Sequence, residues 1–168
     1  MPATYEKIQS TTLVSTQTTL SFTSISSAYT DIVVAIAYKS ASTNNPTLRL
    51  TFNGSSTGYS GRQLYGNPNS VVTSNNNTNA AFISVARAVG GPATVGGTAA
   101  VLIHLMDYAS TNKYKSILAQ TGNADPGGEL DVGVWANNSA INQINIDTGT
   151  GNDFAAGTVI TLYGIKAA

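Results

Sequence analysis

Apolar and polar residues alternate in the stretch LRLTFNG, residues 48–54 of this 168-residue chain, and the alternation decides the fold class. Leu48, Leu50 and Phe52 occupy every second position, which places them on one face of an extended strand. The dipeptide Asn53-Gly54 that ends the stretch is typical of the tight turn of a β-hairpin. The stretch therefore predicts a half-buried strand that ends in a hairpin turn.

The same two-residue period recurs along most of the chain. Leu20 and Phe22 alternate with Thr and Ser, and the apolar run at residues 32–38 indicates a strand buried on nearly both faces. Further strands are predicted at residues 82–86, 101–106, 114–118, 130–135, 141–146 and 158–165. No apolar stripe at helical spacing continues for three turns, so little helix is expected. The sequence predicts one all-β domain over residues 1–168, an antiparallel, jelly-roll-like β-sandwich of about eight strands.

Connectors rich in Gly, Pro, Asn and Asp separate these strands. The longest, residues 66–79, is expected to be a loop, and loops of that length often carry contacts, although an ordinary exposed excursion fits equally well. Tyr59, Tyr65 and Tyr108 fall in or near expected loops, where aromatic side chains anchor protein interfaces or sugar rings. The candidate partner contacts are Tyr59, Tyr65, Asn67, Asn76 and Tyr108.

The amino-acid composition argues against several classes of function. The chain has no Cys, which excludes disulfides and thiolate chemistry. Eight basic and eight acidic residues give a net charge of zero, which argues against nucleic acid as the main partner. Charged residues make up only 10% of the chain, and a neutral polar surface suits a protein packed in an assembly. With no signal-like start and no apolar run of about 20 residues, we expect synthesis in a cytoplasm and no membrane partner.

Few residues suggest catalysis. His104 has no orienting partner nearby in the sequence, so a packed or interface histidine is favoured. Glu129 and Asp131 would share a face of a strand and could in principle hydrolyse glycosides, but a solvated strand start is favoured. Lys113 and Lys115 flank Tyr114 and are interpreted as a solvated strand face, whereas Trp135 is expected in the core.

The segment from Asp147 to Phe154 is a polar cluster that resembles one turn of a calcium-binding β-helix repeat. Such repeats need several stacked copies, and here there is one, so a Gly-rich hairpin loop is favoured. We expect no catalytic residue, metal or cofactor, and we expect that the protein is not an enzyme.

Both ends of the chain resemble a group of tailed-bacteriophage virion structural proteins, common in phages of aquatic bacteria including cyanobacteria. The similar segments are residues 5–8, 11–13, 21–25, 29–32, 48–54, 59–60 and 157–165. The resemblance is a pattern of strands and turns, and residues 67–153 fall outside it. It implies a virion component with a jelly-roll-like fold, placed on either the head or the tail.

The leading expectation is a capsid decoration, or cement, protein on the outer surface of the virion. It would bind the major capsid protein and copies of itself as a homo-oligomer, with a trimer as one option. The alternative is a tail-tip or tail-fibre receptor-binding module that recognises host surface glycans. A glycan depolymerase would rest only on Glu129, Asp131, Asp147 and Asp153, for which no catalytic constellation is visible.

Overall fold

The computed structural model describes residues 5–41, 47–67, 70–86, 98–123, 127–149 and 154–166, with the side chains of 67, 70–75 and 123 excepted. The described residues form twelve strands and no helix. The strands are β1 (Tyr5–Thr12), β2 (Thr19–Phe22), β3 (Asp31–Lys39), β4 (Leu48–Phe52), β5 (Tyr59–Asn67), β6 (Ser70–Ala80), β7 (Ile83–Val85), β8 (Thr98–Met106), β9 (Lys115–Asn123), β10 (Gly128–Trp135), β11 (Ile144–Asp147) and β12 (Val159–Ile165).

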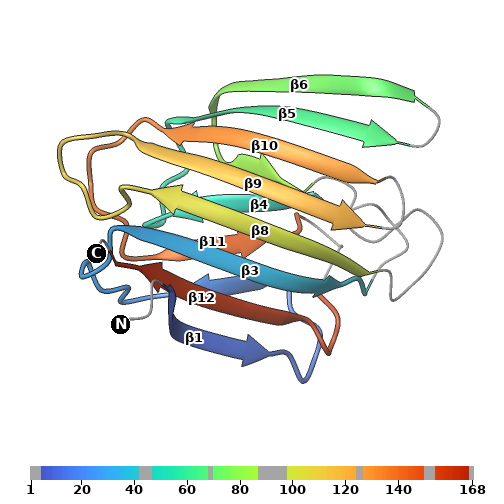
Figure 1. Ribbon diagram of the computed structural model, residues 1–168, viewed down its shortest axis with the longest axis horizontal. Coiled ribbons are helices and arrows are strands. Elements are labelled where there is room, and N and C mark those ends of the chain that lie inside the picture. Colours follow the sequence, from blue (N-terminus) through green and yellow to red (C-terminus); the bar gives the residue numbers. More distant parts are fainter. Residues whose placement is uncertain are drawn as a thin grey trace.

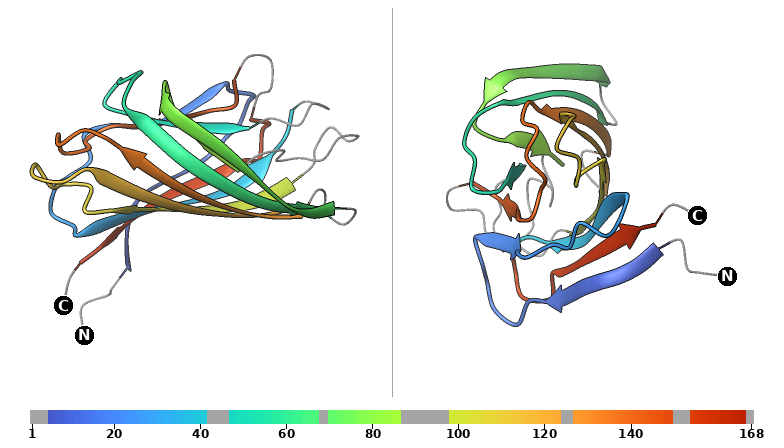
Figure 2. Two further views of the ribbon diagram at one scale, coloured as in Figure 1. Left: turned by 90° about the horizontal axis from the view of Figure 1, so that it is seen from above. Right: turned by 90° about the vertical axis from the view of Figure 1, so that its left-hand side faces the viewer.

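The strands form two antiparallel sheets that pack as a β-sandwich (Figure 1). The large sheet has the order β1-β12-β3-β8-β9-β10-β5-β6, and the small sheet has the order β2-β11-β4-β7. Figure 2 shows the large sheet curving around the small one, so that one face of the large sheet lies inside and the other outside. The all-β sandwich predicted from the sequence is confirmed.

Eight of the strands form a jelly roll. Strands β1 and β12, β2 and β11, β3 and β8, and β4 and β7 pair antiparallel, so each pair lies inside the previous one along the chain. This nesting is that of one long hairpin rolled into two four-stranded layers, which is the jelly-roll plan.

The other four strands extend the large sheet. Strands β9, β10, β5 and β6 follow β8 as a contiguous block, which we call the extension. Strand β6 runs from Ser70 to Ala80, so the loop predicted for residues 66–79 is wrong over most of its length. Strands β1 and β5 were also not predicted. The described residues therefore form twelve strands where the sequence predicted about eight.

The turn after β4 is present, but it joins the two sheets and makes no hairpin. Asn53 and Gly54 both have positive φ, at 51° and 69°, and Ser55 N donates to Phe52 O at 2.8 Å, as in a type I′ turn. Strand β4 lies in the small sheet and β5 in the large one, so they do not pair. The Asn53 side chain also accepts hydrogen bonds from Asn142 N and Gln143 N.

Phe52, Tyr59 and Trp135 pack against one another in the core, next to the turn after β4. Trp135 stacks on Tyr59 with ring centroids 6.0 Å apart, and Phe52 lies 5.5 Å from Trp135. The Tyr59 hydroxyl accepts a hydrogen bond from Phe52 N at 2.8 Å. Trp135 is 1% exposed, which confirms its predicted place in the core.

Candidate interaction surface on the large sheet

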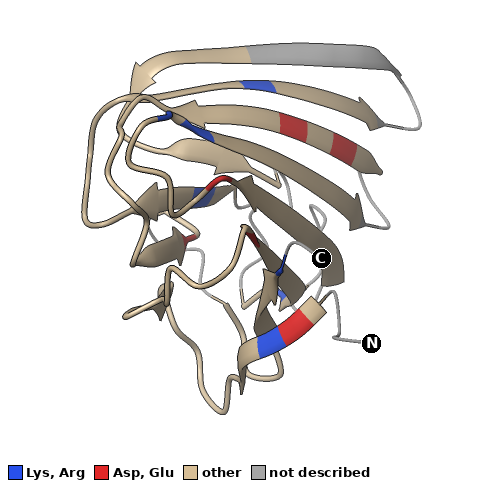
Figure 3. Ribbon diagram, turned by 60° about the vertical axis from the view of Figure 1, so that its left-hand side comes forward, with Lys and Arg blue, Asp and Glu red and all other residues tan. Residues whose placement is uncertain are grey.

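Strand β10 is unusual because its first half turns acidic side chains inward and apolar side chains outward. Glu129 and Asp131 are 9% and 1% exposed, whereas the intervening Leu130 and the next residue, Val132, are 37% and 49% exposed. Figure 3 marks the two acids as red bands on β10. The predicted solvated strand start is therefore wrong: the two acids do share a face, but it is the inner face of the sheet.

The exposed apolar residues of β10 continue across neighbouring strands. In one cross-strand row Leu102 of β8, Gln120 of β9, Leu130 and Leu64 of β5 are register partners in turn. Leu102 is 45% exposed and Leu64 47%. In the next row, Leu118 of β9 is opposite Val132. We call these five residues the outer apolar face: Leu64, Leu102, Leu118, Leu130 and Val132.

A shallow groove of about 570 Å³ adjoins the outer apolar face on its jelly-roll side. Small residues line it, including Ala35 and Ala37 of β3, Ala100 of β8 and Gly122 of β9. Ala35 is the register partner of Leu102, so the groove and the apolar residues lie on one continuous surface. A raised apolar area beside a groove of small residues is a shape that another protein surface can interlock with.

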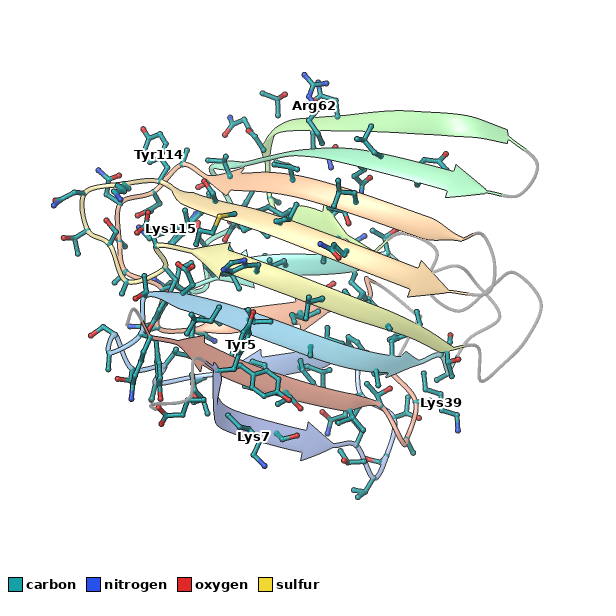
Figure 4. All side chains as sticks on the ribbon, viewed as in Figure 1. Tyr5, Lys7, Lys39, Arg62, Tyr114 and Lys115 are labelled. Carbon is teal, nitrogen blue, oxygen red and sulfur yellow. The ribbon has the colours of Figure 1, made fainter. Side chains whose placement is uncertain are left out.

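Few charges interrupt this outer surface. Arg62, labelled in Figure 4, lies on β5 opposite Val132. His104 follows Leu102 on β8, and its Nε2 lies 3.1 Å from Asp31 Oδ2 of β3. Asp31 Oδ1 also accepts a hydrogen bond from Asp107 N at 2.9 Å. His104 therefore has the orienting partner that local sequence did not reveal, because Asp31 lies 73 positions away.

A polar cluster lies behind the outer apolar face, between the two sheets. Gln63 Nε2 of β5 donates to Glu129 Oε1 at 3.2 Å and to Ser84 O of β7 at 3.4 Å. Ala86 N, at the end of β7, donates to Asp131 Oδ2 at 3.0 Å. Burial raises the pKa of Asp131, while the hydrogen bonds from Ala86, Glu129 and Gln63 oppose that rise.

The structure corrects two of the predicted partner contacts. Tyr59 begins β5 and is fully buried with its hydroxyl bonded inside the core. Tyr108 is also fully buried; its hydroxyl donates to Ser26 O and accepts from Tyr29 N. Both hydroxyls are satisfied within the chain, so neither tyrosine is available to anchor a partner.

The other three predicted contacts lie on the extension. Tyr65 is partly buried on the inner face of β5, where its register partner is Glu129. Asn76 is an exposed residue of β6, opposite Arg62. Asn67 ends β5, and its side chain lies outside the described part of the chain. Only Asn76 among the five is described as exposed.

The Lys113-Tyr114-Lys115 segment is partly exposed and partly buried. Tyr114 and Lys115 are labelled in Figure 4. Tyr114 is 59% exposed, and Lys113 forms an exposed ion pair with Asp107 at 2.9 Å. Lys115 is fully buried, and its Nζ donates to the carbonyls of Ser110 and Lys113 at 2.6 and 2.7 Å. Desolvation lowers the pKa of Lys115. The predicted solvated face is therefore wrong for Lys115.

The segment after β11 offers little to a cation in the part that the structure describes. Asp147 Oδ1 accepts a hydrogen bond from Gly149 N at 2.8 Å, which closes a local turn. Residues 150–153, including Asp153, lie outside the described residues. Within the described ranges no group of three His, Cys, Asp or Glu side chains could hold a metal ion. The same ranges contain no helix long and apolar enough to cross a membrane.

Comparison with known proteins adds little. No protein-family model matches the chain, and no curated protein matches it. Among solved structures, a crystal structure of scytalido-glutamic peptidase with a transition-state analogue inhibitor is similar at 11% identity and a TM-score of 0.31. The alignment covers 88% of this chain and 75% of that one. A likeness this distant carries no argument about what this chain does.

Proposed function

We propose that this protein is a phage virion structural protein that decorates the outer capsid surface, and that it docks through the outer apolar face. The observation that carries the proposal is the exposure of Leu64, Leu102, Leu130 and Val132 on three strands of one sheet, β5, β8 and β10. Contiguous apolar patches of this kind mark sites of association in soluble proteins. The resemblance of the chain ends to virion proteins supplies the kind of partner.

The energy available from this face favours an oligomer. Covering the exposed half of one leucine or valine is worth about 1 kcal/mol, so the four residues together are worth about 4 kcal/mol. A free energy of that size corresponds to a dissociation constant of about 1 mM for one copy. Several linked copies on a symmetric shell would bind far more tightly through multivalency. A homo-oligomer, as expected from the sequence, meets this requirement.

Recognition of host glycans at the tail has less support. That alternative relied on loop aromatics and abundant Asn; Tyr59 and Tyr108 are both buried, whereas Asn76 is exposed. Tyr114 remains as an exposed aromatic residue near the β8–β9 connection. Tyr5 of β1 is also exposed, at 57%. Two exposed rings are a smaller basis for sugar binding than an apolar face spread over four strands.

The copy number of the protein in purified virions tests its location. Quantitative mass spectrometry against the major capsid protein is expected to give comparable numbers for the two. A few copies to a few tens per particle would favour the tail and receptor binding. Absence from the particle would reject a virion role altogether.

A matched pair of variants tests the docking surface. Val132→Asp places a carboxylate in the outer apolar face, whereas Val14→Asp changes a valine that is 92% exposed in the β1–β2 connection. An uncompensated charge buried at an interface costs about 3–5 kcal/mol, so Val132→Asp should bind undecorated capsids at least about 100-fold more weakly. Val14→Asp should bind as the parent does.

Both variants are first checked for an unchanged urea unfolding transition, and binding is then measured by cosedimentation with capsids. Equal binding by the two variants would remove the outer apolar face from the proposal. It would leave the virion location, which the copy number tests separately.

A further inference from the structure

The described strands of the large sheet end in two edges, β1 and β6, which differ in how open they are to another chain. An edge strand exposes a row of backbone N–H and C=O groups that a further strand can pair with. Native proteins block such rows with charges, proline, bulges or very short strands. In the small sheet the edge strands β2 and β7 are only four and three residues long.

Strand β1 is blocked in two of these ways. Glu6 and Lys7 place charges on it, and Glu6 forms an ion pair with Lys166 at 2.7 Å. The register with β12 shifts between Lys7 and Gln9, so an irregularity interrupts the strand before its middle. Strand β1 therefore offers a second chain neither an uncharged nor a regular edge.

Strand β6 is the longest of the described strands and lacks these features. Its eleven residues, Ser70–Ala80, include no charged residue and no proline. The register with β5 is irregular only near the strand ends, and residues 73–77 pair with residues 61–65 without interruption. Among the described strands only β5 pairs with it, and β6 is the outermost strand of the sheet in Figure 1 and in the right-hand view of Figure 2.

The exposed side chains of β6 suit a copy of the same strand. Asn76, Thr78 and Asn79 are exposed and uncharged. When a strand pairs antiparallel with its own copy, equivalent side chains approach each other, and like charges at such positions are destabilising. Amide and hydroxyl groups both donate and accept hydrogen bonds, so identical groups can bond to each other.

We infer that two copies of this chain join edge to edge through β6, antiparallel and related by a two-fold axis, so that their large sheets form one continuous sheet. The axis that relates two antiparallel strands of one sheet runs perpendicular to that sheet, so the same face of both copies points the same way. The outer apolar faces of the two copies therefore lie on one side of the dimer. Leu64 on β5, the strand next to β6, brings the two faces close to the axis.

This arrangement supplies the linked copies that weak docking by one copy requires. Two outer apolar faces turned toward the same shell bind together, and the second contact is then intramolecular. The use of the dimer on a capsid rests on the proposed function. The pairing of β6 does not, and it is measured on the purified protein without any capsid.

Lysine substitutions on the two edges of the large sheet test the pairing. Asn76→Lys places a positive charge one position from the middle of β6, close to its counterpart in the other copy, and Thr78→Lys places one nearer the strand end. The parent should sediment as a dimer, and Asn76→Lys should raise the dimer dissociation constant at least about tenfold. Thr78→Lys should raise it in the same direction, and it serves if a lysine opposite Arg62 weakens the fold.

The matched control makes the same threonine-to-lysine change on the other edge. Thr11→Lys alters an exposed position of β1 and should dimerise as the parent does. Each variant is first checked for an unchanged urea unfolding transition, so that a lost dimer is not mistaken for a lost fold.

Hydrogen exchange shows which strand the second copy covers. In the parent, backbone amides of β6 should exchange more slowly above the dissociation constant than below it, and those of β1 should not change. A parent that stays monomeric at every concentration would overturn the inference. So would a dimer that both β6 lysines leave intact and that protects no amide of β6. Either result leaves the copy number and the Val132→Asp experiment to test the proposed function separately.

Discussion

Strands β3 and β10 lie in the same sheet and alternate with the same period, yet they place different side chains inside. Strand β3 buries Ile32, Val34 and Ile36, as a jelly-roll strand should. The first half of β10 buries Glu129 and Asp131 and exposes the apolar residues between them. Alternation therefore decides which residues share a face, but it does not decide which face is inside.

The two regions use their apolar side chains differently: those of the jelly roll stabilise the fold, and we propose that the exposed ones of the extension serve association. In the jelly roll, apolar burial stabilises the chain by itself. In the extension, part of the apolar surface stays in water, and the inner face combines apolar residues such as Trp135 with hydrogen-bonded polar ones such as Gln63 and Glu129. Contiguous exposed apolar residues mark sites of association, which is why we propose the extension as the docking region.

The sharpest test of this comparison removes one leucine from each region. Leu50 of β4 is fully buried, and Leu50→Ala should cost about 2–5 kcal/mol of unfolding free energy through the lost contacts and the cavity. Leu64→Ala on the outer face of the extension should cost less than about 1 kcal/mol. Urea denaturation measures both. Equal losses would mean that Leu64 is packed within the monomer.

A second test uses two glycines. A Cβ at Gly164 of β12 would lie 2.2 Å from the ring of Tyr29, whereas a Cβ at Gly122 of β9 meets nothing within 4 Å. Gly164→Ala should destabilise the jelly roll by about 1–3 kcal/mol through overpacking. Gly122→Ala, in the groove of the outer surface, should be neutral or slightly stabilising. A thermal melt of each variant decides, and a neutral Gly164→Ala would show that Tyr29 can move aside.

A third test addresses the polar interior of the extension. Lys115→Met would leave the carbonyls of Ser110 and Lys113 without their buried donor, at a cost of about 1–3 kcal/mol. Lys113→Met removes only an exposed ion pair and should change stability by less than about 1 kcal/mol. If the two variants unfold at the same urea concentration, the buried ammonium contributes nothing to stability.

The smallest effect is expected at the His104–Asp31 pair on the outer surface. Asp31→Asn keeps an oxygen to accept the hydrogen bond from Asp107 N but removes the charge facing His104. Partly exposed pairs contribute about 0–1 kcal/mol, so the unfolding midpoint should barely move. A loss of several kcal/mol would show that this pair is structural.

Sequence periodicity located the jelly-roll strands except β1, and in the extension it located β9 and β10 but missed β5 and β6. The stretch Leu48–Phe52 alternates clearly and lies where expected, in β4. Strand β6 was read as a loop because its Ser, Thr and Asn residues look like a connector; it is an edge strand with a partner on one side only. The pairing of His104 with Asp31 and the burial of Lys115 depend on tertiary contacts that no local pattern encodes.

The nested pairing also sets the order in which the protein can be completed during synthesis. Strand β1 has one partner, β12, and the register joins Tyr5 to Ile165 across almost the whole described chain. The hairpin of β9 and β10 can close as soon as it emerges from the ribosome, because its strands are neighbours in the chain. Strand β1 must wait until β12 has been made. Pairings of such long range fold slowly, and until then the edge of β3 stays open to misplaced strands.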